Sequence, residues 1–106
     1  MVNNNPNTLS IIKKMSLDLI PGSKVLLFGS RARNENSTDS DYDFLVITQQ
    51  PIDGILRRNF QSMLRKELAK LKIPADILIQ SEEEVAKKKD IIGHIIREIV
   101  SEGVTL

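Results

Sequence analysis

The sequence predicts an α/β fold of the α+β kind, in which helices flank a small mixed β-sheet. Three short apolar segments have the length and composition of strands, and stretches with apolar residues every three or four positions separate them. This alternation is typical of a sheet with helices packed on it. The chain has 106 residues, which is enough for one compact domain, and we expect no second one.

The composition is that of a globular protein and does not by itself name a partner. Hydrophobic residues make up 41% and charged residues 27% of the chain, unlike the composition of disordered proteins. A formal net charge of +1 gives no field that would attract nucleic acid or an anionic membrane. The lack of cysteine excludes disulfides and thiolate zinc sites. Without a membrane-spanning apolar run or a leader-like start, we expect a cytoplasmic protein.

The first predicted elements are a tail, a helix and a buried strand. Residues 1–7 are rich in asparagine and lack periodicity, which predicts a disordered tail before a domain over residues 8–106. Helical spacing of apolar residues begins after Thr8, a predicted N-cap, and ends at Pro21. The run KVLLF at residues 24–28 is short, continuous and apolar, which is typical of a strand covered on both faces.

The middle of the chain predicts a loop, a second strand and the longest helix. Residues 31–40 pass from helix-tolerant types to polar turn formers, so we expect a short helical turn and an exposed loop. The segment DYDFLVIT at residues 41–48 then re-enters the sheet. Over residues 53–71, apolar side chains recur at intervals of three and four, which predicts a helix whose arginines and lysines form a solvated face.

A third strand and a capped helix follow. The segment ADILI at residues 75–79 is apolar apart from one carboxylate, which predicts a strand. Ser81, with Glu84 three residues later, is a capping-box pattern and opens a helix that runs to about residue 89.

The last predicted elements are a helix over residues 90–101 and an edge strand over residues 104–106. The isoleucines of this helix either enter the core or form an exposed stripe for a partner, and the sequence leaves both open. His94 is the single histidine and falls in the middle of the predicted helix. We interpret it as a packed or half-exposed residue rather than a ligand.

Three carboxylates are expected to meet at one patch of the sheet. Asp41 and Asp43 are two residues apart on a predicted strand, so their side chains leave the same face and can converge on one hard cation. Asp76 lies on another apolar strand, where an unpaired carboxylate facing the core would be costly. If these strands are neighbours with matching faces, a divalent metal relieves the repulsion among the three acids. Oxygen ligands favour Mg²⁺ or Mn²⁺ over zinc.

An anion site is expected beside these acids. Gly29 and Ser30 follow a buried strand and precede a helical turn, so backbone N–H groups and a hydroxyl there could face a phosphate. Arg31 and Arg33 could add positive charge, but alternate positions on a helical turn do not share a face, and only one is expected to reach the anion. A phosphate cradle beside a carboxylate-held metal is what nucleotidyl or phosphoryl transfer requires.

The segment GSRARNENSTDSDYD resembles the signature of the DNA polymerase beta-like nucleotidyltransferases, in particular their minimal nucleotidyltransferase (MNT) branch. Ten residues separate Ser30 from Asp41, as in that signature. The third carboxylate of the family is matched by Asp76 in ADILI. The closing IIREIVSEGVTL is similar to the helix-Glu-Gly-strand ending of small members. The resemblance implies the nucleotidyltransferase fold.

The resemblance also implies a reaction, cofactors and a partner. The reaction would be the metal-dependent transfer of a nucleoside monophosphate, foremost AMP from ATP, to a hydroxyl acceptor, with Asp76 helping to deprotonate that hydroxyl. Minimal members are often antitoxins paired with a helical HEPN toxin, so a HEPN-domain protein is the expected partner, and a homo-oligomer is possible. By role, the implied site residues are Gly29, Ser30, Arg31 and Arg33 for the nucleotide and Asp41, Asp43 and Asp76 for Mg²⁺ or Mn²⁺ and catalysis.

The match has one departure, and two other motifs are excluded. The family usually has glycine after GSRAR, where this chain has Asn34, which tolerates a left-handed backbone well enough for the turn to survive. A calcium loop starting at Asp39 would need glycine and glutamate where Phe44 and Gln50 stand. No Gly-Lys-Ser/Thr of a Walker loop is present.

A non-catalytic module is the alternative to an enzyme. Such a module would bind a nucleotide, or neutralise a partner by contact alone, without turnover. The sequence leaves the nucleotide base and the acceptor open.

Overall fold

The predicted α+β fold is present in the computed structural model, which describes residues 6–33 and 41–106. Over those residues no helix has the length and apolar character needed to cross a membrane. In chain order the elements are α1 (Pro6–Leu19), β1 (Lys24–Phe28), α2 (Gly29–Ala32), β2 (Tyr42–Thr48), α3 (Gly54–Lys70), β3 (Ala75–Ser81), α4 (Glu82–Lys88), α5 (Ile95–Glu102) and β4 (Val104–Thr105).

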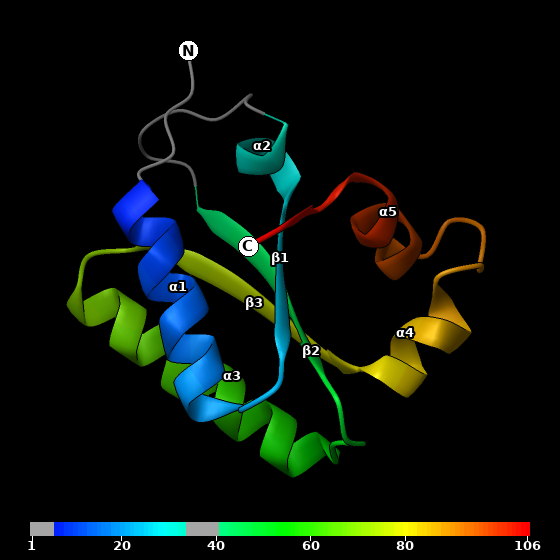
Figure 1. Cartoon of the computed structure of the whole chain (residues 1–106), viewed down its shortest axis with the longest axis horizontal. Helices are drawn as coiled ribbons and strands as arrows, with labels where there is room; N and C mark the ends of the chain where they lie inside the picture. Colours follow the sequence, from blue (N-terminus) through cyan, green and yellow to red (C-terminus); the bar gives the residue numbers. More distant parts are fainter. Residues whose placement is uncertain (1–5, 34–40) are drawn as a thin grey trace.

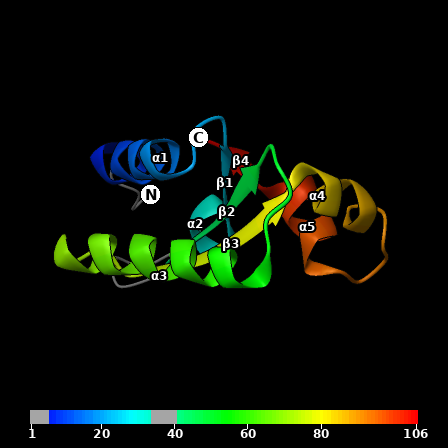
Figure 2. The same ribbon diagram turned by 90° about the horizontal axis from the view of Figure 1, so that it is seen from below.

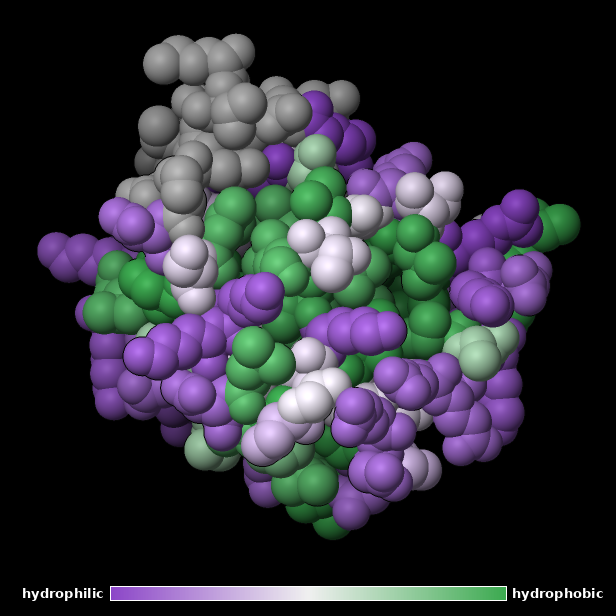
Figure 3. All heavy atoms as spheres, viewed as in Figure 1, coloured by the Kyte–Doolittle hydropathy of each residue, from purple (hydrophilic) through white to green (hydrophobic). Residues whose placement is uncertain are grey.

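The strands form one mixed sheet in the order β3-β2-β1-β4 (Figure 2). β1 pairs antiparallel with β2 and with β4, whereas β2 pairs parallel with β3 through the crossover helix α3. Hydrophobic residues gather at the middle of the molecular face that carries β4, with hydrophilic residues around them (Figure 3). On β4 itself, Val104 is 48% exposed.

Helices cover both faces of the sheet (Figure 1). On one face, Ile12 of α1 and Leu64 of α3 are buried in a core with Phe44 of β2. On the other face, Ile96 of α5 is buried with Leu45, the next residue of β2. Successive residues of β2 therefore point into different cores, as the alternation of side chains along a strand requires.

Two predicted helix boundaries are wrong. α1 begins at Pro6 rather than after Thr8, because proline is well accommodated in a first helical turn. Two residues of the predicted tail are therefore helical, and residues 1–5 lie outside the described residues. The last helix begins at Ile95 rather than residue 90.

The late start of α5 has a local cause. Gly93 has a left-handed backbone, with φ of +82°, and interrupts the helix expected there. His94 is therefore not in mid-helix but is the N-cap, whose Nδ1 accepts a hydrogen bond from the Ile96 N–H at 3.1 Å. The helical spacing of isoleucines continues across this break, so periodicity alone could not show it. Both options for the isoleucines occur, because Ile99 is buried and Ile92 is 87% exposed.

One arginine of α3 is not on the solvated face predicted for it. The Nη2 group of Arg57 donates to Oε1 and Oε2 of Glu84 at 2.8 and 2.9 Å. The two side chains are only 23% and 28% exposed. Ser81 and Glu84 form the predicted capping box at the start of α4, so this pair joins α3 to α4.

Glu84→Gln is expected to lower the free energy of unfolding by about 1 kcal/mol at pH 7, because an amide accepts weaker hydrogen bonds from Arg57 than a carboxylate. Burial raises the pKa of Glu84, but hydrogen bonds from the Ser81 backbone and Arg57 outweigh burial and hold it below its usual 4.5. The native carboxylate thus contributes stability above pH 4.5, and this is lost as the pH falls through the lowered pKa. Urea denaturation at pH 7 and in acid measures the difference.

Glu83→Gln is the matched control for this prediction. Glu83 is exposed and, among the residues that the structure describes, pairs only with Lys87 of its own helix. Its neutralisation should therefore change the free energy of unfolding by less than about 0.5 kcal/mol. Equal losses in the two variants, or a difference that does not shrink in acid, would contradict the role given to the Arg57–Glu84 pair.

Candidate functional site

The structure puts Asp43 and Asp76 on one face of the sheet and Asp41 just before β2, where its charge acts on Asp43. Asp43 and Asp76 are in-register partners of the parallel pair β2–β3, so their side chains leave the same face. The Tyr42 N–H donates to the Pro74 carbonyl at 2.9 Å, which fixes this register from the first residue of β2. Asp41 lies two residues before Asp43. We refer to Asp41, Asp43 and Asp76 as the acid row.

Within the acid row, the pKa of Asp43 is raised. Burial raises the pKa of Asp43, and the negative charges of Asp76 and Asp41 raise it further. The positive charge of Arg33 acts in the opposite direction without cancelling these effects. Like charges at such proximity favour either a proton or a bound cation.

Gly29 lies directly against Asp43. Phe28, the residue before it, is the in-register partner of Asp43 across β1 and β2. The backbone of Gly29 is left-handed, with φ of +73°, and a Cβ added there would collide with Oδ2 of Asp43. Both the backbone conformation and this contact exclude a side chain. The predicted glycine-serine bend is therefore beside the acid row, with Ser30 half-buried in α2.

The two candidate arginines lie on different sides of the sheet. Arg31 is 3% exposed, and its guanidinium lies 3.8 Å from the centroid of the Tyr42 ring. Tyr42 belongs to the core under α1 and α3, on the face opposite Asp43. Arg33 is exposed at the end of α2 and acts electrostatically on Asp43. The structure thus brings Arg33 to the acid row and uses Arg31 to hold α2 against β2.

Different losses are therefore expected from the two arginines. Arg31→Gln should lower the free energy of unfolding by about 2 kcal/mol, because it removes a buried cation–π contact. Arg33→Gln should leave stability within about 0.5 kcal/mol of the wild type and weaken about tenfold the Mg²⁺-ATP binding that the sequence resemblance implies, because an exposed charge is lost near the acid row. Thermal denaturation and isothermal titration calorimetry measure the two effects. Equal loss of nucleotide affinity without loss of stability in Arg31→Gln would contradict this division.

The acid row fits a divalent cation by its chemistry but does not form a closed site. All its donors are carboxylate oxygens, which Mg²⁺ and Mn²⁺ prefer, and a cation would relieve the repulsion that raises the pKa of Asp43. Within residues 6–33 and 41–106, however, no three acidic, histidine or cysteine side chains are arranged as a ready-made metal site. Asp76 faces a cation of the protein itself.

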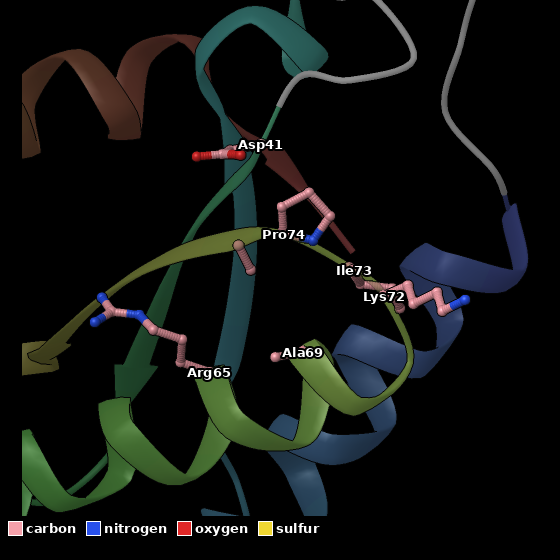
Figure 4. Close-up of a pocket in the computed structure, with 7 residues that line it drawn as sticks. Asp41, Arg65, Ala69, Lys72, Ile73 and Pro74 are labelled. Atoms are coloured by element: carbon pink, nitrogen blue, oxygen red, sulfur yellow. The ribbon is translucent and has the colours of Figure 1, made fainter.

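That cation is Arg65 of α3, which the sequence did not single out. Its Nη2 lies 3.6 Å from Oδ1 of Asp76, and the two side chains are 59% and 65% exposed. The Arg65 side chain extends from α3 toward the edge strand β3 (Figure 4). It meets an acid that points to the face of the sheet opposite α3. The spacing of α3 gives no signal for such a contact, because it depends on how the helix lies along the sheet edge.

Asn34, where the family usually has glycine, and Asp39, the first acid of the excluded calcium loop, lie outside the described residues. The predicted exposed loop over residues 31–40 is described only up to Arg33. Its first part is the short helix α2, as the sequence predicts.

The chain belongs to the nucleotidyltransferase domain family, whose model matches residues 8–104. It is therefore a nucleotidyltransferase by family, as the resemblance of the GSRAR and DYD segments predicts. Among curated proteins none matches the chain.

Solved structures share the fold at low sequence identity. A Sulfolobus solfataricus protein described as a nucleotidyltransferase has a TM-score of 0.62 and 20% identity, over 93% of this chain and 76% of its own. A chain of a toxin–antitoxin complex with AMP-PNP has a TM-score of 0.63 and 21% identity, over 96% of this chain and 72% of its own. A chain of a Shewanella oneidensis complex between a tri-AMPylated HEPN toxin and an MNT antitoxin has a TM-score of 0.56 and 20% identity, over 93% and 68%.

Proposed function

We propose that this chain is a metal-dependent adenylyltransferase, which moves AMP from ATP to a hydroxyl group and releases pyrophosphate. The observation that supports it best is the parallel register of Asp43 and Asp76 beside a glycine that admits no side chain. This arrangement supports a site in which acids from two strands act beside the glycine-serine bend. Family membership supports the reaction class, and the choice of AMP rests on the resemblance alone.

In this proposal each residue has a separate task. Asp41, Asp43 and Asp76 hold Mg²⁺ or Mn²⁺, which supplies Lewis-acid stabilisation of the charge that develops on the phosphates. Gly29 and Ser30 bind the triphosphate with a backbone N–H and a hydroxyl, and Arg33 adds positive charge. Arg31 has a positioning role, because its contact with Tyr42 fixes α2, the helix that carries Gly29 and Ser30.

The chemical step is a single displacement at the α-phosphorus. The acceptor oxygen forms a bond to that phosphorus as the bond to the bridging oxygen of the β-phosphate breaks, and pyrophosphate leaves. The proton of the acceptor hydroxyl passes to the carboxylate of Asp76. That carboxylate lies at the strand edge with 65% of its side chain exposed, where an acceptor can reach it.

We propose that a HEPN-domain toxin is the partner and acceptor, with this chain as its antitoxin. Support comes from the fold shared with chains of two toxin–antitoxin complexes, one of them containing a HEPN toxin that carries AMP. The competing possibility is a module that neutralises the toxin by contact. The Arg65–Asp76 pair favours this second function, because it gives Asp76 a cation of the protein itself.

Labelled ATP separates the two functions. The protein is incubated with Mg²⁺, α-labelled ATP and a candidate HEPN-domain partner, and label on the partner is measured. We expect transfer from ATP rather than CTP, lost in Asp41→Asn and kept in Asp18→Asn, whose acid lies on α1. Neutralisation that persists in the Asp41→Asn, Asp43→Asn double variant without any transferred label would support the contact module. Light scattering of the same samples tests whether the chain forms a homo-oligomer.

A further inference from the structure

A hollow of about 450 Å³ adjoins the acid row at the β3 edge of the sheet (Figure 4). Asp41 and Arg65 lie on its rim, and Ala69, Pro74 and Ala75 contribute apolar surface. Ala75 and Asp76 point to opposite faces of β3. Arg65 on the rim, however, lies 3.6 Å from the Asp76 carboxylate, so the hollow lies at the same sheet edge as the proposed proton acceptor. Lys72 also lines it, but its ammonium group extends away from the hollow.

The strand order determines which substrate can use this hollow. Gly29 and Ser30 follow β1, whereas Asp76 lies on β3, and β2 with Asp43 runs between them. With the triphosphate at Gly29 and Ser30, pyrophosphate leaves on the β1 side. Attacking and leaving oxygens are roughly in line in this displacement, so the acceptor must approach from the β3 side, where the hollow lies.

Arg65 gives the hollow a specific chemistry. Its 3.6 Å separation from Asp76 is longer than a hydrogen bond, so the pair employs none of the five guanidinium N–H donors in that way. Exposed pairs of this kind add little to stability, so the fold does not depend on it. A cation bound by Asp76 would further reduce the attraction between the two side chains. A planar guanidinium is well suited to bind a second anion in two-point geometry.

We propose that this hollow receives the acceptor and that Arg65 recognises an anionic group, a phosphate or a carboxylate, carried beside the acceptor hydroxyl. The proposal rests on the proposed transferase function, since it assigns the second substrate of that site. Arg65 is then a specificity-determining residue, and the apolar surface of Ala69, Pro74 and Ala75 contacts the rest of the acceptor.

Binding of three related probes tests this proposal without requiring turnover. Isotope-labelled protein, saturated with Mg²⁺ and AMP-PNP, is titrated by NMR with adenosine, 5′-AMP and adenosine 5′-carboxylate, which differ only at the 5′ position. We expect at least one of the two anions to shift the Ala69 and Ala75 amide signals and to bind about tenfold more tightly than adenosine. Comparison of 5′-AMP with the carboxylate then identifies the preferred anion.

Arg65→Gln should reduce this preference to less than about threefold and leave the affinity for adenosine unchanged. Lys66→Gln, at the neighbouring exposed position, removes the same charge and should keep the preference. Equal binding of adenosine and both anions, a preference that survives Arg65→Gln, or shifts confined to Gly29 and Ser30 would overturn the proposal. Tight anion binding at the hollow in a protein that transfers no label would instead overturn the transferase function and leave Arg65 as an anion ligand.

Discussion

Asp43→Asn is expected to lower the rate of nucleotidyl transfer about a thousandfold, because a central carboxylate is lost where charge develops in the transition state. Asp43 is the acid that touches Gly29 and pairs in register with Asp76, so no neighbouring carboxylate can replace it. Asparagine has nearly the same shape, so the contact with Gly29 should persist. Single-turnover transfer of label from α-labelled ATP measures the rate, with Asp18→Asn as control for the loss of one negative charge on the opposite face.

The same substitution is expected to stabilise the metal-free protein at neutral pH. Burial and the charges of Asp76 and Asp41 raise the pKa of Asp43 above its usual 3.8. Folding therefore opposes ionisation of Asp43, and the wild type loses stability as the pH rises from 3.8 through the raised pKa. Asparagine avoids this loss, so its melting temperature should exceed that of the wild type at pH 7, and the gap should close below pH 3.8. Lower stability of Asp43→Asn at pH 7 without metal would show that the acid row is not under charge repulsion.

Gly29→Ala should impair both folding and catalysis. A left-handed backbone at a non-glycine residue costs about 1–2 kcal/mol, and the added Cβ also collides with Oδ2 of Asp43. If the carboxylate moves by about 1 Å to make room, transfer should fall about a hundredfold. Thermal denaturation gives the stability, and single-turnover transfer at a temperature well below the melting point gives the rate.

Gly93→Ala separates the two causes of that effect. Gly93 has nearly the same φ as Gly29, +82° against +73°, but a Cβ there meets no atom within 4 Å. Its substitution should reproduce the loss of stability and leave transfer within about twofold of the wild type. A comparable fall in transfer in both variants would mean that the contact between Gly29 and Asp43 does not matter for catalysis.

Much of the fold could be predicted because strands and helices of this chain differ clearly in periodicity. KVLLF and DYDFLVIT appear as adjacent strands, and Ser81 with Glu84 caps α4 as the pattern indicates. The boundaries near His94 could not be predicted, because the left-handed backbone of Gly93 interrupts a run of isoleucines whose spacing remains helical. The start at Pro6 could not be predicted, because a proline among asparagines is equally typical of a polar tail.

The sequence predicts that the acids lie close together only if their strands are neighbours in the sheet. It shows the spacing of Asp41 and Asp43 but not which strand pairs with theirs. The parallel pairing of β2 and β3 satisfies that condition. The sequence predicts that only one of Arg31 and Arg33 reaches the site, and the two lie apart as expected. Which one reaches it could not be predicted, because Arg31 follows Tyr42 into the core on the opposite face. Arg65 could not be found, because its contact with Asp76 depends on a tertiary arrangement that helical periodicity does not encode.

Because β2 pairs with β3, activity also requires a fixed number of residues in the crossover between the two strands. Side chains alternate along a strand, so inserting or deleting one residue between Leu71 and Pro74 would move every residue of β3 by one position. Asp76 would then point into the hydrophobic layer beneath α3, and the residue beside Asp43 would be Ala75 after an insertion or Ile77 after a deletion. Enzymes built on this plan can thus be inactivated by a change of spacer length that alters none of their functional residues, and natural length variation should concentrate away from this connection.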